Sequence, residues 1–353
     1  MVLLCSWLTR ELFNRHKKPD NKGNIPLSTT LFLMAVVTVL EAFQLYLHVA
    51  SGWFKAEMIK SYVARPALQR SGCFSHAMLS LLLSFKTLGS WEDKLGQYSL
   101  LHNYDGTLCL VDKAKKGHRR GKLVKLSKEV KQAVIESLVE CNGVHDKLSW
   151  ACRGKVTHTI LVWHIATTIC KHKLDVSLPK NSRSSSKQLQ GDNTAISKEV
   201  ASSLSQYCAY LVAFAPDLLP GHSFDSVSML DESIKEACEL DLPQGGNSKA
   251  MEKKCDMLMS ISDANHDDAR IIIQGARLAR QLTEEIQNMK LQWKVLSDFW
   301  AEMILYVAPC DDAQARAHLE ALARGGEFIT HLWALLTHAG VLERDHAGPM
   351  AAV

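Results

Sequence analysis

The residues of this sequence best suited to chemistry lie near its C-terminus. Glu327, His331 and His338 fall at offsets of 0, 4 and 11, which places them within about 40° of each other on one helix face. His318 precedes them in a neighbouring helical pattern. Two or three histidines with one carboxylate are a common ligand set for zinc or non-haem iron. One hypothesis is therefore a metal-dependent enzyme that uses these four residues.

The same residues also have a purely structural interpretation. Glu327 would cap the N-terminus of the last helix, where the helix dipole favours a carboxylate, and the histidines would form its polar face. The sequence lacks an H-E-x-x-H pattern, and a Glu-x-x-x-His spacing often arises by chance. No glycine-rich phosphate loop and no nucleophile elbow is present either. The sequence thus leaves open whether the protein is an enzyme and identifies no cofactor.

A second group of polar residues interrupts the longest apolar stretch, at 31–50. Sixteen of these twenty residues are apolar, and a helix of this length is about 30 Å long, the thickness of a hydrocarbon core. Thr38, Glu41, Gln44 and His48 fall at offsets of 0, 3, 6 and 10, within a sector of about 120°. We expect a transmembrane helix whose polar stripe faces other transmembrane helices or a second copy of the chain. Such a wall would also suit a component of a transporter or channel.

A third group is the basic run at 113–131, which follows the membrane-proximal part of the chain. Basic residues beside an anionic bilayer contribute about 1 kcal/mol each, so the run is either a lipid-contacting segment or a solvated loop. Nucleic acid is disfavoured because no aromatic residues alternate with the basic ones. From Leu123 onward a helical stripe of apolar residues predicts that the run enters a helix. The candidates for lipid contact are Lys115, Lys116, Arg119, Arg120 and Lys122.

Composition and cysteine usage limit the class and location of the protein. The chain has 353 residues, 47% of them hydrophobic, and a formal net charge of +4, so a sizeable core is possible and no acidic partner is implied. Ten cysteines occur without a C-x-x-C pair, and there is no N-x-[ST] sequence. These features favour free, reduced cysteines that act as small hydrophobic residues. We therefore expect the protein in a membrane, with the bulk of the chain in the cytosol.

The hydrophobic periods beyond residue 156 are helical, and no segment alternates with a sustained period of two. They predict helices at 156–172, 196–215, 226–239, 271–286 and 293–307, and a last one between Gly326 and Gly340. We expect an all-α fold with one transmembrane helix followed by a helical cytosolic domain. The predicted regions are 1–53 (basic segment and transmembrane helix), 54–111 (membrane-proximal helices), 112–155 (basic linker and helix), 156–342 (C-terminal helical domain, with mobile loops near 179–194 and 241–250) and 343–353 (tail).

Several strings of this sequence resemble known plant families. ILVWHIATTIC (160–170), LSQYCAYLVAFAPDLLPG (204–221), QWKVLSDFWAEMILYVA (292–308) and HLEALARGGEFITHLWALLTH (318–338) resemble Domain of Unknown Function 594. TTLFLMAVVTVLEAFQLYLHVASGW (29–53) and KLGQYSLL (94–101) are similar to the end of its usual partner, Domain of Unknown Function 4220. The resemblance implies a plant membrane protein with a multi-helix membrane domain and a helical C-terminal domain, but it implies no reaction. Most of the membrane domain is missing, so we expect a chain truncated at its N-terminus.

The leading functional hypothesis is an uncharacterised membrane-anchored helical interaction module whose cytosolic domain docks partners. The alternatives are the transporter or channel component and the metal-dependent enzyme described above.

Overall fold

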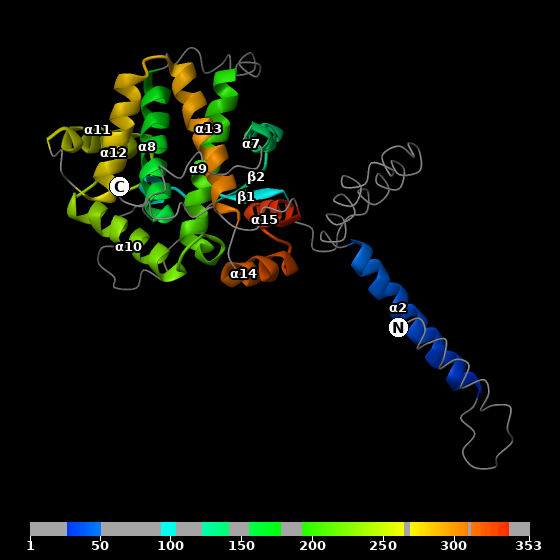
Figure 1. Ribbon diagram of the computed structural model, residues 1–353. Coiled ribbons are helices and arrows are strands. Elements are labelled where there is room, and N and C mark those ends of the chain that lie inside the picture. Colours follow the sequence, from blue (N-terminus) through cyan, green and yellow to red (C-terminus); the bar gives the residue numbers. More distant parts are fainter. Residues whose placement is uncertain are drawn as a thin grey trace, which may run out of the picture. The chain divides into compact units, whose positions relative to one another are not determined.

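The computed structural model describes residues 27–50, 93–103, 122–140, 155–177, 193–264, 269–309 and 312–338. They fall into two compact units, each described here by itself. One unit holds helix α2, and the other, which we call the helical body, holds all remaining described elements (Figure 1). The predicted tail at 343–353 and most of the predicted loop near 179–194 lie outside the described residues.

Helix α2 spans Leu27–Ala50, so the helix predicted at 31–50 is present and begins four residues earlier. Its side chains are described for residues 32–47. Within the described part of the chain, no helix is both long enough and apolar enough to cross a membrane. The prediction of a helix at this place is confirmed, and the prediction that it crosses a membrane is not.

The helical body contains one small sheet, which the prediction of an all-α fold missed. Two strands pair antiparallel, with Leu95 opposite Val124: β1 (Lys94–Gly96) and β2 (Leu123–Lys125). The helix predicted from Leu123 begins only at the start of α7 (Lys128–Glu140). Strands of three residues are too short to show an alternating pattern, so periodicity does not reveal them.

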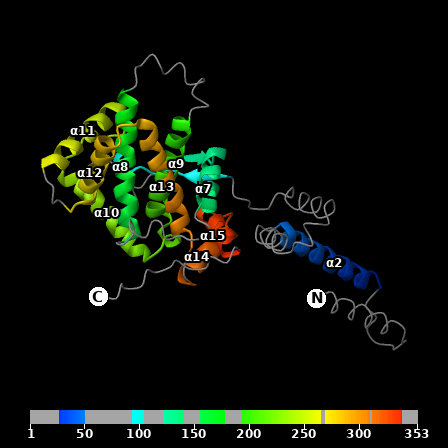
Figure 2. The same cartoon turned by 45° about the horizontal axis from the view of Figure 1, so that its top comes forward.

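Four long helices form the core of the body and lie side by side in Figures 1 and 2: α8 (Val156–Ser177), α9 (Asn193–Phe214), α12 (Ile271–Glu285) and α13 (Met289–Val307). Helix α9 packs against both α8 and α13, and α12 packs against α8. At the contact between α8 and α12, a Cβ on Gly275 would lie 2.6 Å from the Cβ of Ile165. Glycine therefore lets these two helices approach closely. The apolar periods predicted all four helices.

One face of α13, the helix predicted at 293–307, is buried. Its apolar residues with helical spacing are all buried: Trp293, Leu296, Trp300, Met303 and Val307. The Trp300 indole donates a hydrogen bond to Thr167 Oγ1 on α8 at 2.9 Å. On the opposite side of α13, Lys294 pairs with Asp298 at 2.5 Å, with both side chains about half exposed. The stripe therefore joins α13 to the core, and the ion pair lies at the surface.

Further helices surround this core: α6 (Leu100–Asn103), the 3-10 helix η4 (Pro216–Leu218), α10 (Ser223–Glu239), α11 (Ser248–Ala264), α14 (Asp312–Ala323) and α15 (Phe328–His338). The sequence predicted α10 and α15 but missed α11. The buried positions of α11 have helical spacing, yet one is a lysine and two are methionine and cysteine: Met251, Lys254, Cys255 and Leu258. An apolar stripe is hard to recognise when a charged residue occupies one of its positions.

The cysteines only partly fit the prediction that they are free. Cys170, Cys208 and Cys255 are free and buried, and burial raises the pKa of each thiol, to about 12 for Cys170 and Cys255. They behave as small hydrophobic residues with inert thiols. Cys238 is disulfide-bonded, which corrects the prediction for this residue.

Candidate functional site

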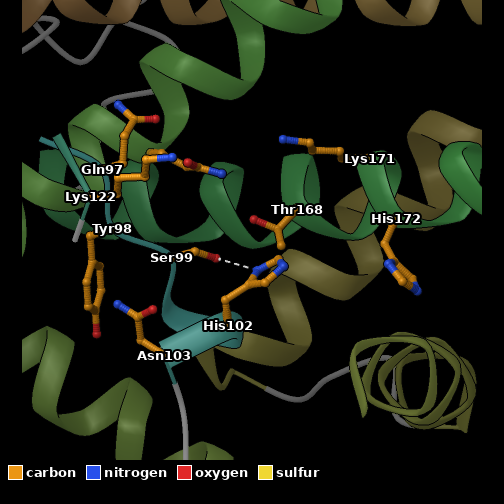
Figure 3. A pocket seen from close by; sticks show the side chains of 10 residues that line it. Gln97, Tyr98, Ser99, His102, Asn103, Lys122, Thr168, Lys171 and His172 are labelled. Carbon is orange, nitrogen blue, oxygen red and sulfur yellow. Dashed lines mark hydrogen bonds between the residues drawn. The ribbon is translucent and has the colours of Figure 1, made fainter. Parts of the chain in front are cut away.

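A polar pocket lies beside the segment that joins β1 to α6. Its volume is about 290 Å³, and it opens between this segment and the helices α8 and α9. Its lining comes from four parts of the sequence: Gln97, Tyr98, Ser99, His102, Asn103, Lys122, Thr168, Lys171, His172 and Gln206 (Figure 3). We call it the basic pocket because it contains two lysines and two histidines and no acidic side chain among these residues.

The segment that carries His102 is fastened to α9 by its backbone and by one side chain. Tyr98 N–H donates to the carbonyl of Gln206 at 3.1 Å, and Gln97 Nε2 donates to the carbonyl of Ser203 at 3.2 Å. A Cβ on Gly96 would lie 2.4 Å from the ring of Tyr210, so the strand can reach α9 only with glycine at this position.

A buried histidine holds the start of α6 against the core. His164 on α8 accepts a hydrogen bond from the N–H of Leu100 through Nε2 at 3.4 Å. Its Nδ1 lies 2.9 Å from the hydroxyl of Ser205 on α9. Burial lowers the pKa of His164 to about 3, so the ring is neutral at physiological pH. With Nε2 as acceptor, Nδ1 carries the proton and donates it to Ser205. His164 thus connects three helices below the pocket.

A buried lysine holds the end of α6 from the other side. Lys254 on α11 is fully buried, and its ammonium donates to the carbonyls of Leu101 at 2.5 Å and Gly245 at 2.8 Å. A Cβ on Gly246 would lie 2.6 Å from the carbonyl oxygen of His102. The loop before α11 therefore packs directly against the backbone of the residue that enters the pocket.

The basic pocket carries positive potential. Desolvation by the surrounding protein lowers the pKa of His102 below 6.5, and the positive charges of Lys171 and Lys254 lower it further, with a smaller effect from His172. In Figure 3 the ammonium of Lys171 and the ring of His102 lie on either side of Thr168, whereas the ring of His172 points away. Ser99 Oγ lies 3.1 Å from His102 Nδ1, which fixes the orientation of the ring.

The structure does not assemble the metal site predicted from His318, Glu327, His331 and His338. All four residues are described, and no group of three or more His, Cys, Asp or Glu side chains in the described ranges could hold a metal ion.

Three of these residues, Glu327, His331 and His318, have other neighbours. Glu327 precedes the first residue of α15, so the helical offsets do not apply to it, and its carboxylate accepts a hydrogen bond from the Tyr210 hydroxyl at 3.3 Å. His331 Nε2 faces Gly326, where a Cβ would lie 2.7 Å from it. His318 is buried and stacks on Trp333, with ring centroids 5.0 Å apart. Metal binding by these residues stays a prediction, since the described side chains do not form one cluster.

The polar stripe of α2 is partly satisfied within the helix. The Thr38 hydroxyl donates to the carbonyl of Met34 at 2.8 Å, so it does not require a partner helix. Gln44 is exposed and Glu41 is half-buried, while the side chain of His48 lies outside the described residues.

Four of the five basic residues predicted to contact lipid lie outside the described residues: Lys115, Lys116, Arg119 and Arg120. The fifth, Lys122, is exposed and lines the basic pocket.

A second, larger hollow of about 810 Å³ lies along η4 and α10, and most of the charged side chains that line it are acidic. One of its carboxylates has a clear structural task. Glu236 accepts hydrogen bonds from the N–H groups of Ile271 and Ile272, both at 3.0 Å, and so caps the N-terminus of α12.

Comparison with protein families gives two matches. Residues 1–104 match the model described as Domain of unknown function (DUF4220), and residues 285–341 match the model described as Protein of unknown function, DUF594. The chain is thus similar to these two families over separate parts of its length. No curated protein and no solved structure matches it.

The two matches cover different parts of the structure. The DUF594 match contains α13, α14 and α15, and with them Trp300 and Glu327. The DUF4220 match contains α2 and also β1 and α6. The last residues of the DUF4220 match therefore belong to the helical body, where they form one wall of the basic pocket.

The sequence did not reveal this pocket, because its residues come from segments that are far apart along the chain. The available signal was the basic end of α8, Lys171-His172-Lys173, which follows an otherwise apolar helix.

Proposed function

We propose that the protein is a membrane-anchored helical module, in which α2 is the attachment to the bilayer and the helical body is the part that binds partners. The observation that carries this proposal is the exposure of apolar side chains on α2. Ten large apolar residues between 32 and 47 are exposed: Phe32, Leu33, Val36, Val37, Val39, Leu40, Phe43, Leu45, Tyr46 and Leu47.

Such a surface is costly in water. Full burial of one large apolar side chain contributes about 1.5–3 kcal/mol, so ten half-exposed ones favour leaving water by on the order of 10 kcal/mol in total. Glu41 opposes insertion by about 2.5–3.5 kcal/mol if it lies at the centre of the bilayer. The balance favours contact of α2 with lipid.

Unlike α2, the helical body buries its apolar surface within itself, which supports different roles for the two parts. Its four long helices bury their apolar faces against each other, and it has its own polar pocket. The body therefore does not require lipid to cover its core.

We expect the body on the cytosolic side. The chain has no N-x-[ST] sequence, and Cys170, Cys208 and Cys255 are free. The disulfide of Cys238 argues in the other direction, because disulfides are rare in the cytosol.

Alkaline carbonate extraction of membranes from cells that express the full chain tests the anchoring. The wild-type chain should stay in the membrane pellet, and a variant with Val39→Asp and Leu45→Asp should be released. The matched control replaces two exposed apolar residues of the body, Phe224→Asp and Leu319→Asp, and should stay in the pellet. Release of the wild-type chain would contradict the proposal, as would release of the control together with the α2 variant.

A further inference from the structure

We propose that the outer strand of the small sheet, β2, binds the surface of an anionic membrane, with its lysines at the lipid headgroups and its two apolar side chains between them. The inference rests on the proposed attachment by α2, which keeps the body close to a bilayer. It adds a second contact, which depends on the charge of the lipid, whereas the contact of α2 rests on apolar surface.

The sheet has an inner and an outer strand. The inner strand, β1, packs against α9, and its Leu95 and Gly96 are buried. The outer strand, β2, has only exposed residues, with Leu123 at 58% and Val124 at 39%. Successive side chains of a strand point to opposite faces, so both faces of β2 expose an apolar side chain. Within the described residues β2 pairs with no strand other than β1.

Exposed lysines flank these apolar residues. Lys122 and Lys125 lie directly beside them in the sequence, and Lys128 follows at the start of α7. None of the three forms an ion pair with another side chain in the part of the chain that the structure describes, whereas Lys131 is paired with Asp93 at 3.1 Å. The positive charge around β2 therefore stays available to anionic headgroups.

A membrane surface matches both kinds of side chain. Lysines on an edge strand also discourage pairing with other chains, but that role does not account for the apolar side chains exposed between them. At a bilayer interface, apolar side chains enter the boundary between headgroups and acyl chains. The long lysine side chains reach outward to the headgroup phosphates. Leu123 and Val124 with their flanking lysines fit this arrangement.

Helix α7, which follows β2, keeps its acidic residues apart from its exposed apolar ones. Ile135 and Val139 are exposed at 57% and 70%, and Lys128 shares their side of the helix at 100° per residue. The acidic residues lie on another side, centred about 100° away around the helix axis: Glu129, Glu136 and Glu140. The exposed apolar side of α7 thus combines apolar and basic residues, as β2 does.

Hydrogen exchange of the purified full-length chain, followed by mass spectrometry after reconstitution, tests this contact. The probes are vesicles of phosphatidylcholine alone and of equal parts phosphatidylcholine and phosphatidylserine. Each basic residue near an anionic surface favours contact about fivefold, so two lysines favour it about twenty-five-fold. In the anionic vesicles, the amides of residues 122–125 should therefore exchange about tenfold more slowly than in the neutral ones.

A charge reversal separates lipid contact from protection of the strand edge. The variant Lys122→Glu with Lys125→Glu should lose the slowing by phosphatidylserine, although it still carries charges that discourage strand pairing. Both lysines are exposed, so their replacement does not endanger folding. The matched control is Lys253→Glu with Lys290→Glu, which reverses two exposed lysines of α11 and α13. It changes the net charge equally and should behave as the wild type does.

The proposal is overturned if residues 122–125 exchange alike in both kinds of vesicle, or if the two double variants respond alike. Slowing in neutral vesicles that grows with the amount of protein per vesicle would identify a second copy as the partner of β2 and would overturn it too. A wild-type chain that does not float with neutral vesicles contradicts the attachment by α2, and with it this inference. A chain that floats but shows equal exchange overturns only the contact of β2.

Discussion

Trp300 shows how one side chain serves packing and hydrogen bonding together. It is fully buried, its indole donates to Thr167 on α8, and its ring lies edge-on to Phe299. Replacing it with alanine should lower the free energy of unfolding by about 3–5 kcal/mol, because a cavity remains and Thr167 loses a partner. Urea unfolding followed by circular dichroism measures this loss.

Asp298→Ala is the control for Trp300→Ala. It removes a surface ion pair with Lys294, which is worth about 0.3–0.5 kcal/mol on a helix. Equal losses from the two variants would show that the buried face of α13 is assigned wrongly.

At the scale of single elements, the close contact of α8 and α12 depends on Gly275. A methyl group there would meet Ile165 Cβ at 2.6 Å, which is closer than van der Waals contact allows. Gly275→Ala should therefore lower the free energy of unfolding by about 1–3 kcal/mol through overpacking, although alanine favours a helix. Gln281→Ala, at an exposed position of the same helix, should have little effect. A stabilised Gly275→Ala variant would contradict the assigned contact.

The elements also show what the sequence could predict. Long helices such as α13 have an apolar stripe that repeats several times, so periodicity identified them and their buried faces. The strands β1 and β2 have three residues each and leave no period to detect. Helix α11 was missed because Lys254 occupies a core position, where its ammonium is satisfied by the carbonyls of Leu101 and Gly245. Those partners come from other segments and cannot be found by local spacing.

Local sequence spacing likewise decided which candidate sites could be recognised in the sequence. The histidines of the last helix were noticed because they are close in sequence, but Glu327 contacts Tyr210 on α9 instead. The basic pocket was not noticed, because His102, Lys122 and Lys171 are brought together only by the pairing of β1 with β2 and the packing of α6 on α8. Tertiary structure decides which polar residues meet, and local spacing alone does not.

At the scale of the whole molecule, α2 and the helical body are proposed to contact different solvents, lipid and water. The apolar side chains of α2 are exposed, for example Phe32 at 68% and Val39 at 67%, whereas the body buries its apolar stripes within its own core. The family matches cross this division, since the DUF4220 match at 1–104 includes both α2 and the α6 segment of the basic pocket. The DUF4220 match thus includes both the proposed anchor and one wall of the basic pocket.

Flotation of the purified full-length chain with neutral phosphatidylcholine vesicles tests the anchoring most directly. Neutral lipid removes any contribution of the basic residues, so binding reports on apolar surface. We expect the wild-type chain and the Phe224→Asp, Leu319→Asp control to rise with the vesicles, and the Val39→Asp, Leu45→Asp variant to stay at the bottom of the gradient. A wild-type chain that stays at the bottom, or an α2 variant that floats as well as the wild type, would contradict the anchoring.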